Sequence, residues 1–223
     1  MSQKTTEDLI RRAFETGDFT GWFEAVYASA SEGTMKIPWA QMQPAEGLVR
    51  WASEARPQGE GLSALVVGCG LGDDAEFLAG LGYAVTAFDV SPSAIASAQS
   101  RFPQSRVRYQ VADLLDLPVE WRHNFDFVLE HRTIQALPWH FCQPAIEAIS
   151  AQVRHGGQVL VITHGREPHE DKRGIPWRLS REELAHFLAQ GLREVRFDDV
   201  QDPNGRREFR VLYQRDDSGQ YTS

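Results

Sequence analysis

The sequence is poor in cysteine and has no long apolar run. Its two cysteines, Cys69 and Cys142, are too few for a disulfide framework or a paired-cysteine metal site, and this usage favours a reducing compartment. No stretch approaches the ~20 apolar residues that a transmembrane helix needs. The polar segment "SQKTTEDLIRR" after Met1 lacks the apolar core of a signal peptide. We therefore expect a cytoplasmic protein with free thiols and no membrane partner.

Long basic runs are also missing, and the formal net charge is -8. Nonspecific binding of nucleic acids needs lysines and arginines that neutralise phosphates, so we expect no nucleic-acid partner. The seven histidines are scattered without the spacing of metal ligands, which predicts no metal site. What is present is an ordinary globular composition, 42% hydrophobic and 24% charged, and a small molecule is the expected partner.

Apolar strands alternate with amphipathic helices from residue 62 onward. We expect strands at 63–68, 84–89, 107–111, 125–130 and 157–163, and helices near 73–81, 92–101 and 140–153. Such alternation predicts parallel strands joined by crossover helices, and two extended runs around "PNGRR" predict a final antiparallel pair. The fold class is therefore α/β: a Rossmann-like, doubly wound, seven-stranded, mostly parallel sheet with an antiparallel C-terminal strand.

Helical patterns precede the sheet at 5–16, around Phe19–Tyr27 and at about 44–55. A chain of 223 residues is long enough for one self-sufficient domain. We expect an N-terminal helical lid or extension over 1–60, a ligand-binding core over 61–215 and a frayed tail over 216–223. The oligomeric state is expected to be a monomer or a homodimer.

Three glycines, Gly68, Gly70 and Gly72, stand between the first strand of the sheet and the following helix. Without side chains in the way, backbone amides at the helix start can face a ligand, although a tight turn without a ligand is the alternative. Asp89 closes the second strand, where a carboxylate can accept hydrogen bonds from ribose hydroxyls or cap the next helix. The pattern predicts a nucleoside site.

The helix after the glycines begins with Asp73 and Asp74. A dinucleotide fingerprint would place its third glycine at position 73 and a pyrophosphate at the helix start. Two carboxylates there disfavour a pyrophosphate and tolerate a ligand with an ammonium and a sulfonium group. The charge favours S-adenosylmethionine as the cofactor and disfavours an NAD-linked oxidoreductase.

These motifs resemble the cofactor-binding half of class I S-adenosylmethionine-dependent methyltransferases, in the branch of thiopurine S-methyltransferase-like and halide or thiol methyltransferases. The similar segments are "LVVGCGLGDDAEFLAGLGYAVTAFDVSPSAIASAQ", "VADLLDLP", "FDFVLEHRTIQALP", "HGGQVLVITHG" and, upstream, "IPWAQMQPAEGLVRW". The chain departs from the halide and thiol branch at Ala40, Met42 and Gln43, where that branch often has an aspartate and a glycine-arginine pair. The resemblance implies these cofactor-binding residues: Trp39, Gly68, Cys69, Gly70, Gly72, Asp89, Val90, Asp113, Leu114 and Glu130.

The strand "FDFVLE" ends in Glu130, and His131 and Arg132 follow it. Methyl transfer from a sulfonium is an in-line displacement, so the enzyme mainly aligns donor and acceptor. A thiolate needs little further help, whereas an alcohol or phenol needs a base. We take Glu130 and His131 as the catalytic candidates, with His131 as a base or, alternatively, as a helix cap. We expect Arg132 either to contact the substrate or to pair with a nearby carboxylate.

The substrate is expected to meet the helical lid and the polar insertion that follows residue 163. Aromatic faces suit a sulfonium cation and a flat apolar acceptor, although a stripe at helical spacing also packs a core. The candidate substrate residues are Trp22, Phe23, Arg132, His164, Arg166 and Trp177. We predict methyl transfer from S-adenosylmethionine to a thiol or other soft nucleophile of a small molecule. O- or N-methylation of a small natural product with His131 as base, and a non-catalytic S-adenosylmethionine-binding regulatory protein, remain open as alternatives.

Overall fold

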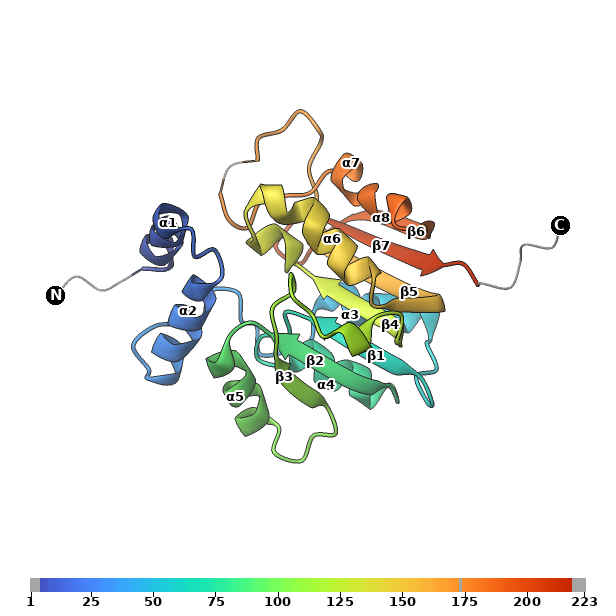
Figure 1. Cartoon of the computed structure of the whole chain (residues 1–223), viewed down its shortest axis with the longest axis horizontal. Coiled ribbons are helices and arrows are strands. Elements are labelled where there is room, and N and C mark those ends of the chain that lie inside the picture. Colours follow the sequence, from blue (N-terminus) through green and yellow to red (C-terminus); the bar gives the residue numbers. More distant parts are fainter. Residues whose placement is uncertain (1–4, 173, 218–223) are drawn as a thin grey trace.

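A seven-stranded sheet runs through the middle of the molecule in the computed structural model, which describes residues 5–172 and 174–217 (Figure 1). The strand order is β3-β2-β1-β4-β5-β7-β6. The strands are β1 (Ser63–Val67), β2 (Ala84–Asp89), β3 (Arg108–Val111), β4 (Phe125–His131), β5 (Val153–His164), β6 (Leu192–Gln201) and β7 (Arg207–Arg215). Strands β1 to β5 are parallel, and β7 lies antiparallel between β5 and β6. The predicted fold class is confirmed.

The strand order reverses at β1, because β2 and β3 lie on one side of it and β4 and β5 on the other. In the register of the sheet, Val67 at the end of β1 lies between Phe88 and Glu130. Open α/β sheets bind ligands at such a switch point, outside the carboxyl ends of the strands. The topology therefore brings the glycine turn, Asp89 and the end of β4 to one edge.

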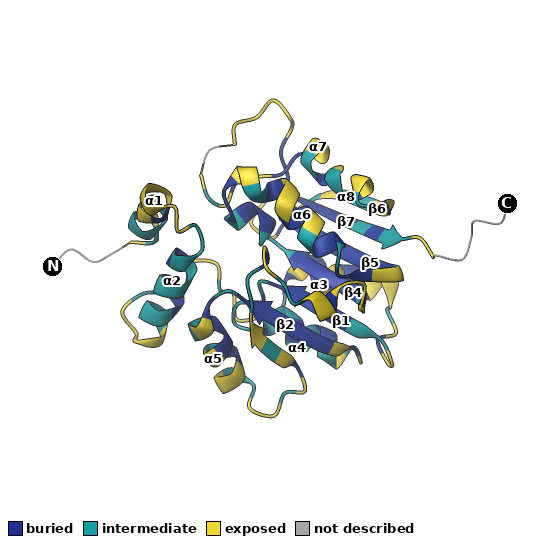
Figure 2. Ribbon diagram, viewed as in Figure 1, coloured by how far each residue is buried: buried dark blue, intermediate teal, exposed yellow. Residues whose placement is uncertain are grey.

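Helices cover both faces of the sheet (Figure 1). They are α3 (Glu46–Ala55), α4 (Asp73–Gly80), α5 (Pro92–Arg101), α6 (Cys142–Ser150), α7 (Arg181–Leu184) and α8 (His186–Ala189), with 3₁₀ turns η1 (Val119–Trp121), η2 (Ile134–Ala136) and η3 (Trp139–Phe141). Successive residues of β4 point to opposite faces: Val128 packs in the cluster that contains Ile146 of α6, and Leu129 in the cluster that contains Leu48 of α3. The strands are buried between these layers (Figure 2).

Helices α1 (Thr6–Thr16) and α2 (Gly21–Ser31) form a separate small cluster around Ala13, Trp22 and Val26. They lie beyond the edge of the sheet, with α2 beside α5 (Figure 1). Helix α3, in contrast, packs on the sheet itself. The division into a lid over 1–60 and a core over 61–215 stays a prediction, and most of the tail, 218–223, lies outside the described residues.

Strand β5 is longer than the sequence indicated, since it begins at Val153 and not at 157. The prediction stopped at the glycine pair because glycine weakens a strand interior. Gly156 adopts a positive φ of 73°, and the pairing between β4 and β5 is irregular between Phe125 and Phe127. The strand continues through this irregularity, which shortens the predicted helix 140–153 to α6. Throughout the described ranges, no helix is both long and apolar enough to cross a bilayer.

Candidate functional site

The glycine turn links β1 to α4 through three residues with positive φ: 58° at Gly68, 52° at Gly70 and 90° at Gly72. L side chains rarely adopt this region, so glycine is required by the backbone itself. Space is also limited at Gly70, where an added Cβ would lie 2.8 Å from the Tyr27 hydroxyl. Cys69 is buried between them, and burial raises the pKa of its thiol well above its ordinary value, so it is an unreactive part of the turn.

Asp89 is the best-positioned carboxylate of the site. Its Oδ2 accepts a hydrogen bond from the Gly70 amide at 2.9 Å, and its Oδ1 accepts one from the Ser91 amide at 3.0 Å. Burial raises its pKa, against the opposing effect of these amides, and the nearby Glu24 raises it further. Val90 follows it at the end of β2, half-buried. The carboxylate is thus fixed between the glycine turn and the start of α5.

An aromatic group from the N-terminal segment lies over the turn. Trp39 donates its indole N–H to the Tyr27 hydroxyl at 3.0 Å, and its ring meets Trp22, Phe23 and Tyr27 edge-on with centroid distances of 5.6, 6.3 and 5.8 Å. Tyr27 and Trp22 are buried, whereas Trp39 is 40% exposed. The structure therefore brings the predicted residues Trp39, Trp22 and Phe23 together next to Gly70, around Tyr27.

The two aspartates at the start of α4 are both paired. Asp73 forms a two-pronged ion pair with Arg101 of α5, with N···O distances of 2.7 and 2.8 Å. Asp74 accepts the Ala45 amide at 2.7 Å and meets His131 Nδ1 at 2.8 Å. Burial would raise the pKa of Asp74, but His131 and the Ala45 amide hold it below its ordinary value. Because Asp73 is neutralised by its partner, the repulsion of a pyrophosphate that the sequence indicated is weaker than expected.

Asp113 and Leu114 follow β3 at the same edge of the sheet. The Ala112 amide donates to the Asp89 carbonyl at 3.1 Å, which places this segment beside the end of β2. Asp113 Oδ1 accepts the Leu115 amide at 2.9 Å and so shapes a local turn, and Leu114 is buried. Asp113 therefore helps to shape the turn that adjoins the ribose candidate Asp89.

Glu130 is completely buried at the end of β4. Its Oε1 accepts the amides of Thr133 at 2.7 Å and Ile134 at 3.0 Å and caps η2, while its Oε2 has no hydrogen-bond partner among the described residues. Burial raises its pKa to about 7, against the lowering effects of the Ile134 amide and of His131. A buried carboxyl with one free oxygen is an unsatisfied polar group in this site.

This raised pKa predicts a pH-dependent stability. Between the ordinary value of 4.5 and about 7 the unfolded chain ionises Glu130 and the folded chain does not, so the wild type loses stability over this range. Glu130→Gln retains the oxygen that caps η2 and removes the charge. We expect it to match the wild type at pH 4.5 and to unfold with a free energy roughly 3 kcal/mol higher at pH 8. Urea denaturation at both pH values measures this, and equal stability at pH 8 would contradict it.

His131 and Arg132 are held by different partners beyond β4. His131 is paired with Asp74, as a base oriented by a carboxylate would be. Arg132 has a positive φ of 61° and donates to Glu208 at 2.9 Å and to Asp202 at 3.5 Å. The carboxylate pairing that the sequence offered as the alternative for Arg132 is therefore present.

The insertion residues are more buried than a substrate-facing loop would be. Arg166 is 1% exposed and donates to Glu183 and to four backbone carbonyls, those of Arg178, Glu167, Pro168 and Glu170. His164 is also buried, and burial together with the nearby Arg132 lowers its pKa to about 4, so it is neutral at pH 7. These contacts favour a structural role for Arg166, and a neutral His164 offers no charge to an anionic substrate.

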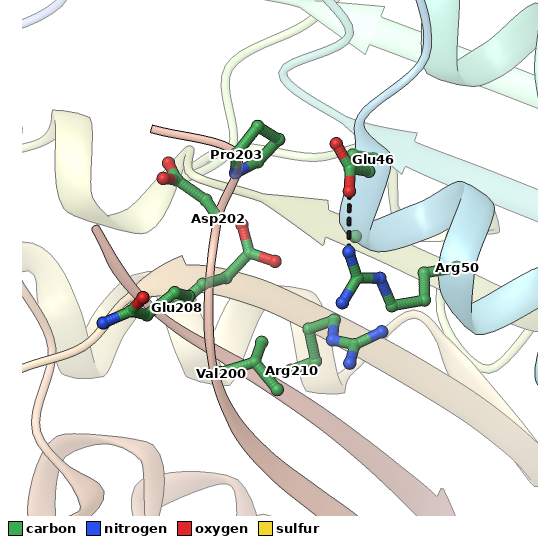
Figure 3. A pocket seen from close by; sticks show the side chains of 9 residues that line it. Glu46, Arg50, Val200, Asp202, Pro203, Glu208 and Arg210 are labelled. Atoms are coloured by element: carbon green, nitrogen blue, oxygen red, sulfur yellow. Dashed lines mark hydrogen bonds and ion pairs between the residues drawn. The ribbon is translucent and has the colours of Figure 1, made fainter. Parts of the chain in front are cut away.

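Among the residues that the structure describes, hollows also lie outside the glycine turn, and two of them differ greatly in volume. The smaller one, between α3 and the β6–β7 turn, has a volume of about 10 Å³, room for one water molecule (Figure 3). The larger one has a volume of about 290 Å³. It is lined by Trp139, His140, Cys142, Gln143, Lys172, Trp177, Glu182, Glu183 and His186. Trp177 is thus in the wall of a hollow large enough for a small organic molecule, while its indole N–H donates to the Leu137 carbonyl at 2.7 Å.

Sequence reasoning missed two residues of α2, Glu24 and Tyr27. Both come from the helix that the sequence assigned to an aromatic lid, but their partners lie far along the chain. Tyr27 contacts the glycine turn, and Glu24 bonds to Ser91 and Ser93 at the start of α5. The only signal was their spacing of three residues, which places both on one face of a helix.

S-adenosylmethionine fits the residues that are present. The turn has no side chain at Gly68 and Gly70, where a nucleoside and its amino-acid portion would approach the backbone. Asp89 can accept ribose hydroxyl protons, and the free Oε2 of Glu130 can accept from an ammonium group. Within residues 5–172 and 174–217, no cluster of three or more His, Cys, Asp or Glu side chains could hold a metal ion.

Residues 64–157 match the family model described as "Methyltransferase domain". The ubiquinone biosynthesis O-methyltransferase of Xanthomonas axonopodis pv. citri (strain 306) is 33% identical over 118 residues, 51% of this chain and 48% of that protein. The chain therefore spans about half the length of the curated relative that it matches.

Many solved structures share the fold, and two of them show the extent of the similarity. One, described as "Conversion of a Disulfide Bond into a Thioacetal Group during Echinomycin Biosynthesis", has a TM-score of 0.73 and 24% identity and covers 91% of this chain and 93% of its own. The other, magnesium protoporphyrin IX methyltransferase from Synechocystis PCC 6803 with bound SAH, has a TM-score of 0.62 and 15% identity and covers 76% and 81%. The matched domain includes the glycine turn, Asp89 and the end of β4. Over these residues the chain matches a methyltransferase domain, and the neighbour with bound SAH shares its fold.

Proposed function

We propose that this chain, as the methyltransferase that its domain indicates, transfers a methyl group from S-adenosylmethionine to sulfur or another soft nucleophile of a small molecule. The observation on which this rests is the Asp89 carboxylate, bonded to the Gly70 amide at 2.9 Å beneath Tyr27 and Trp39. The bound cofactor supplies an electrophilic methyl group on a sulfonium. The cytoplasmic location and the monomeric or homodimeric state stay predictions.

The residues divide the work between binding and alignment. Asp89 binds the ribose, and the segment Asp113–Leu114 beside it borders the adenine. The glycine turn accommodates the amino-acid portion of the cofactor. The free Oε2 of Glu130 can accept a hydrogen bond from the ammonium group of that portion. Tyr27 and Trp39 cover the site and exclude water, which strengthens the electrostatic interactions beneath them. A closed site also holds donor and acceptor in line for the attack on the methyl group.

A soft acceptor is supported by the aromatic surroundings and by the resemblance to the thiopurine S-methyltransferase-like and thiol methyltransferase branch. Phe19 connects α1 to η3, since its ring contacts Phe14 at a centroid distance of 5.5 Å and both His140 and Phe141 at 5.6 Å. His140, one of these two residues, also lines the hollow of about 290 Å³, and we assign the acceptor to this hollow. The neighbour that covers 91% of this chain is described by its sulfur chemistry, a disulfide converted into a thioacetal.

The second candidate is O-methylation with His131 as base. It is favoured by the 2.8 Å contact between His131 Nδ1 and Asp74 and by the O-methyltransferase that matches half of the chain. For a thiol acceptor we expect His131→Ala to change kcat by less than about threefold, because a thiolate forms readily near neutral pH. For an alcohol or phenol we expect a loss of about 10²- to 10⁴-fold.

This prediction is checked by steady-state kinetics on a panel of thiols and phenols, with His155→Ala as the control because His155 is an exposed histidine at the opposite end of β5. A loss of 100-fold or more on every active thiol would overturn the soft-nucleophile assignment. Retained phenol methylation would instead exclude His131 as the base.

Calorimetric titration tests the proposal as a whole. The purified chain is titrated with S-adenosylmethionine, S-adenosylhomocysteine and NAD, and we expect micromolar binding of the first two only. Absence of binding by both would overturn the proposal. Binding without turnover on any acceptor of the panel would favour the non-catalytic regulatory alternative.

A further inference from the structure

Glu24 makes a set of hydrogen bonds that the proposed reaction does not use. Helix α2 lies beside α5 (Figure 1), and Glu24 is a residue of α2 that contacts the start of α5. Its Oε2 accepts the Ser91 hydroxyl at 2.5 Å and the Ser93 amide at 3.1 Å, and its Oε1 accepts the Ser93 hydroxyl at 2.6 Å. We call these three bonds, between Glu24, Ser91 and Ser93, the Glu24 bridge.

The bridge is connected directly to the ribose candidate Asp89. Ser91 is completely buried, its amide donates to Asp89 Oδ1 at 3.0 Å, and its hydroxyl oxygen accepts the Ala94 amide at 3.0 Å as the N-cap of α5. A carboxylate beside a helix N-terminus is favoured by the helix dipole, so Glu24 suits this position when ionised. The Ser91 side chain and backbone therefore connect α2 to Asp89, the carboxylate that is the ribose candidate.

The same face of α2 covers the glycine turn. Tyr27 follows Glu24 by three residues, and such residues are neighbours on a helix surface. The Tyr27 hydroxyl stands over Gly70 and accepts the Trp39 indole N–H. The apolar cluster of α1 and α2 meets the sheet clusters through Phe23, which packs against both it and one of them. The hydrogen bonds of Glu24 add polar contacts that hold the Tyr27 face of α2 against α5.

We propose that Glu24 is a positioning residue for the cofactor: through its bridge to Ser91 and Ser93 it holds α2 closed over the glycine turn. Opening of the bridge then limits how fast S-adenosylmethionine enters and S-adenosylhomocysteine leaves. The proposal rests on the proposed function, because it requires the cofactor to lie at the glycine turn.

The test is the dissociation rate of S-adenosylhomocysteine, measured by stopped-flow displacement from its complex with the full chain. We expect Glu24→Ala to raise this rate about tenfold, because it removes all three hydrogen bonds of the Glu24 bridge. Ser93→Ala removes one of the three bonds and is expected to raise the rate about threefold. Glu32→Ala, which removes an exposed carboxylate at the other end of α2, is the matched control and should leave the rate unchanged.

Hydrogen exchange separates this role from general destabilisation. In Glu24→Ala, amides of α2 (Gly21–Ser31) should exchange faster while those of β1 (Ser63–Val67) keep the wild-type rate, with and without S-adenosylhomocysteine. If the wild-type chain bound neither S-adenosylmethionine nor S-adenosylhomocysteine, both the proposed function and the positioning role of Glu24 would be overturned. Wild-type binding together with an unchanged dissociation rate in both Glu24→Ala and Ser93→Ala would overturn the positioning role alone.

Discussion

Asp89→Ala is expected to weaken the binding of S-adenosylhomocysteine about 100-fold. The substitution removes the acceptor for two ribose hydroxyls, and hydrogen bonds to a charged group are worth about 1.5 to 3 kcal/mol each. It also leaves the Gly70 and Ser91 amides without their carboxylate partner, so the glycine turn is less well ordered. Calorimetric titration of the variant against the wild type at pH 7.5 gives the ratio of dissociation constants.

The control for charge is Asp116→Ala, which removes an exposed carboxylate that follows β3 near the same edge of the sheet. It should bind S-adenosylhomocysteine within a factor of two of the wild type. Asp89→Asn keeps one acceptor oxygen and should fall between the two. If Asp89→Ala bound within about threefold of the wild type while unfolding cooperatively, the ribose would have to lie elsewhere.

Gly70→Ala is expected to reduce affinity for S-adenosylmethionine by about two orders of magnitude. A φ of 52° costs an L residue about 1 to 2 kcal/mol, and the new Cβ would lie 2.8 Å from the Tyr27 hydroxyl, too close to remain. Either the turn or α2 must shift, and the cofactor loses contacts on one side.

The double variant identifies which of these effects dominates. In Tyr27→Phe the hydroxyl is absent, so the ring carbon Cζ becomes the atom of residue 27 that is nearest to the added Cβ. It lies 3.9 Å away, which is an ordinary van der Waals contact. We therefore expect Tyr27→Phe to restore about tenfold of the affinity lost in Gly70→Ala, while Tyr27→Phe alone changes affinity by only a few fold. Strictly additive effects in this double-mutant cycle would show that Tyr27 does not stand over Gly70.

The charge at the start of α4 shows how far sequence reasoning extends at this site. Asp73 and Asp74 were expected to face the ligand together. Arg101 lies 28 positions away from Asp73, and His131 lies 57 positions away from Asp74, yet both pairs are in contact. The preference for S-adenosylmethionine still holds, because it also rests on Asp89, the glycine turn and the matching domain. The charges of Asp73 and Asp74 alone are too well paired to exclude a pyrophosphate.

Arg166 and Trp177 show the same limit for the substrate residues. Both belong to a polar insertion, and polar composition ordinarily indicates an exposed loop. The insertion instead folds against α6 and α7, where Glu183 and backbone carbonyls use every nitrogen of the Arg166 guanidinium. The insertion's composition does not reveal that burial, because the partners of Nε and Nη2, Arg178 and Glu183, lie 12 and 17 residues further along the chain.

Residue patterns alone predict most strands and helices, the antiparallel end of the sheet, the glycine turn and the position of Asp89. These features depend on short periods and on local backbone requirements, such as positive φ at Gly70, that neighbouring residues reveal. Three contacts become visible only in the folded chain: Asp74 meets His131, Tyr27 covers the glycine turn, and Glu24 bridges to Ser91 across 67 positions. Such pairs form where helices pack around the sheet edge, and packing over long sequence separations leaves no periodic signal in the chain.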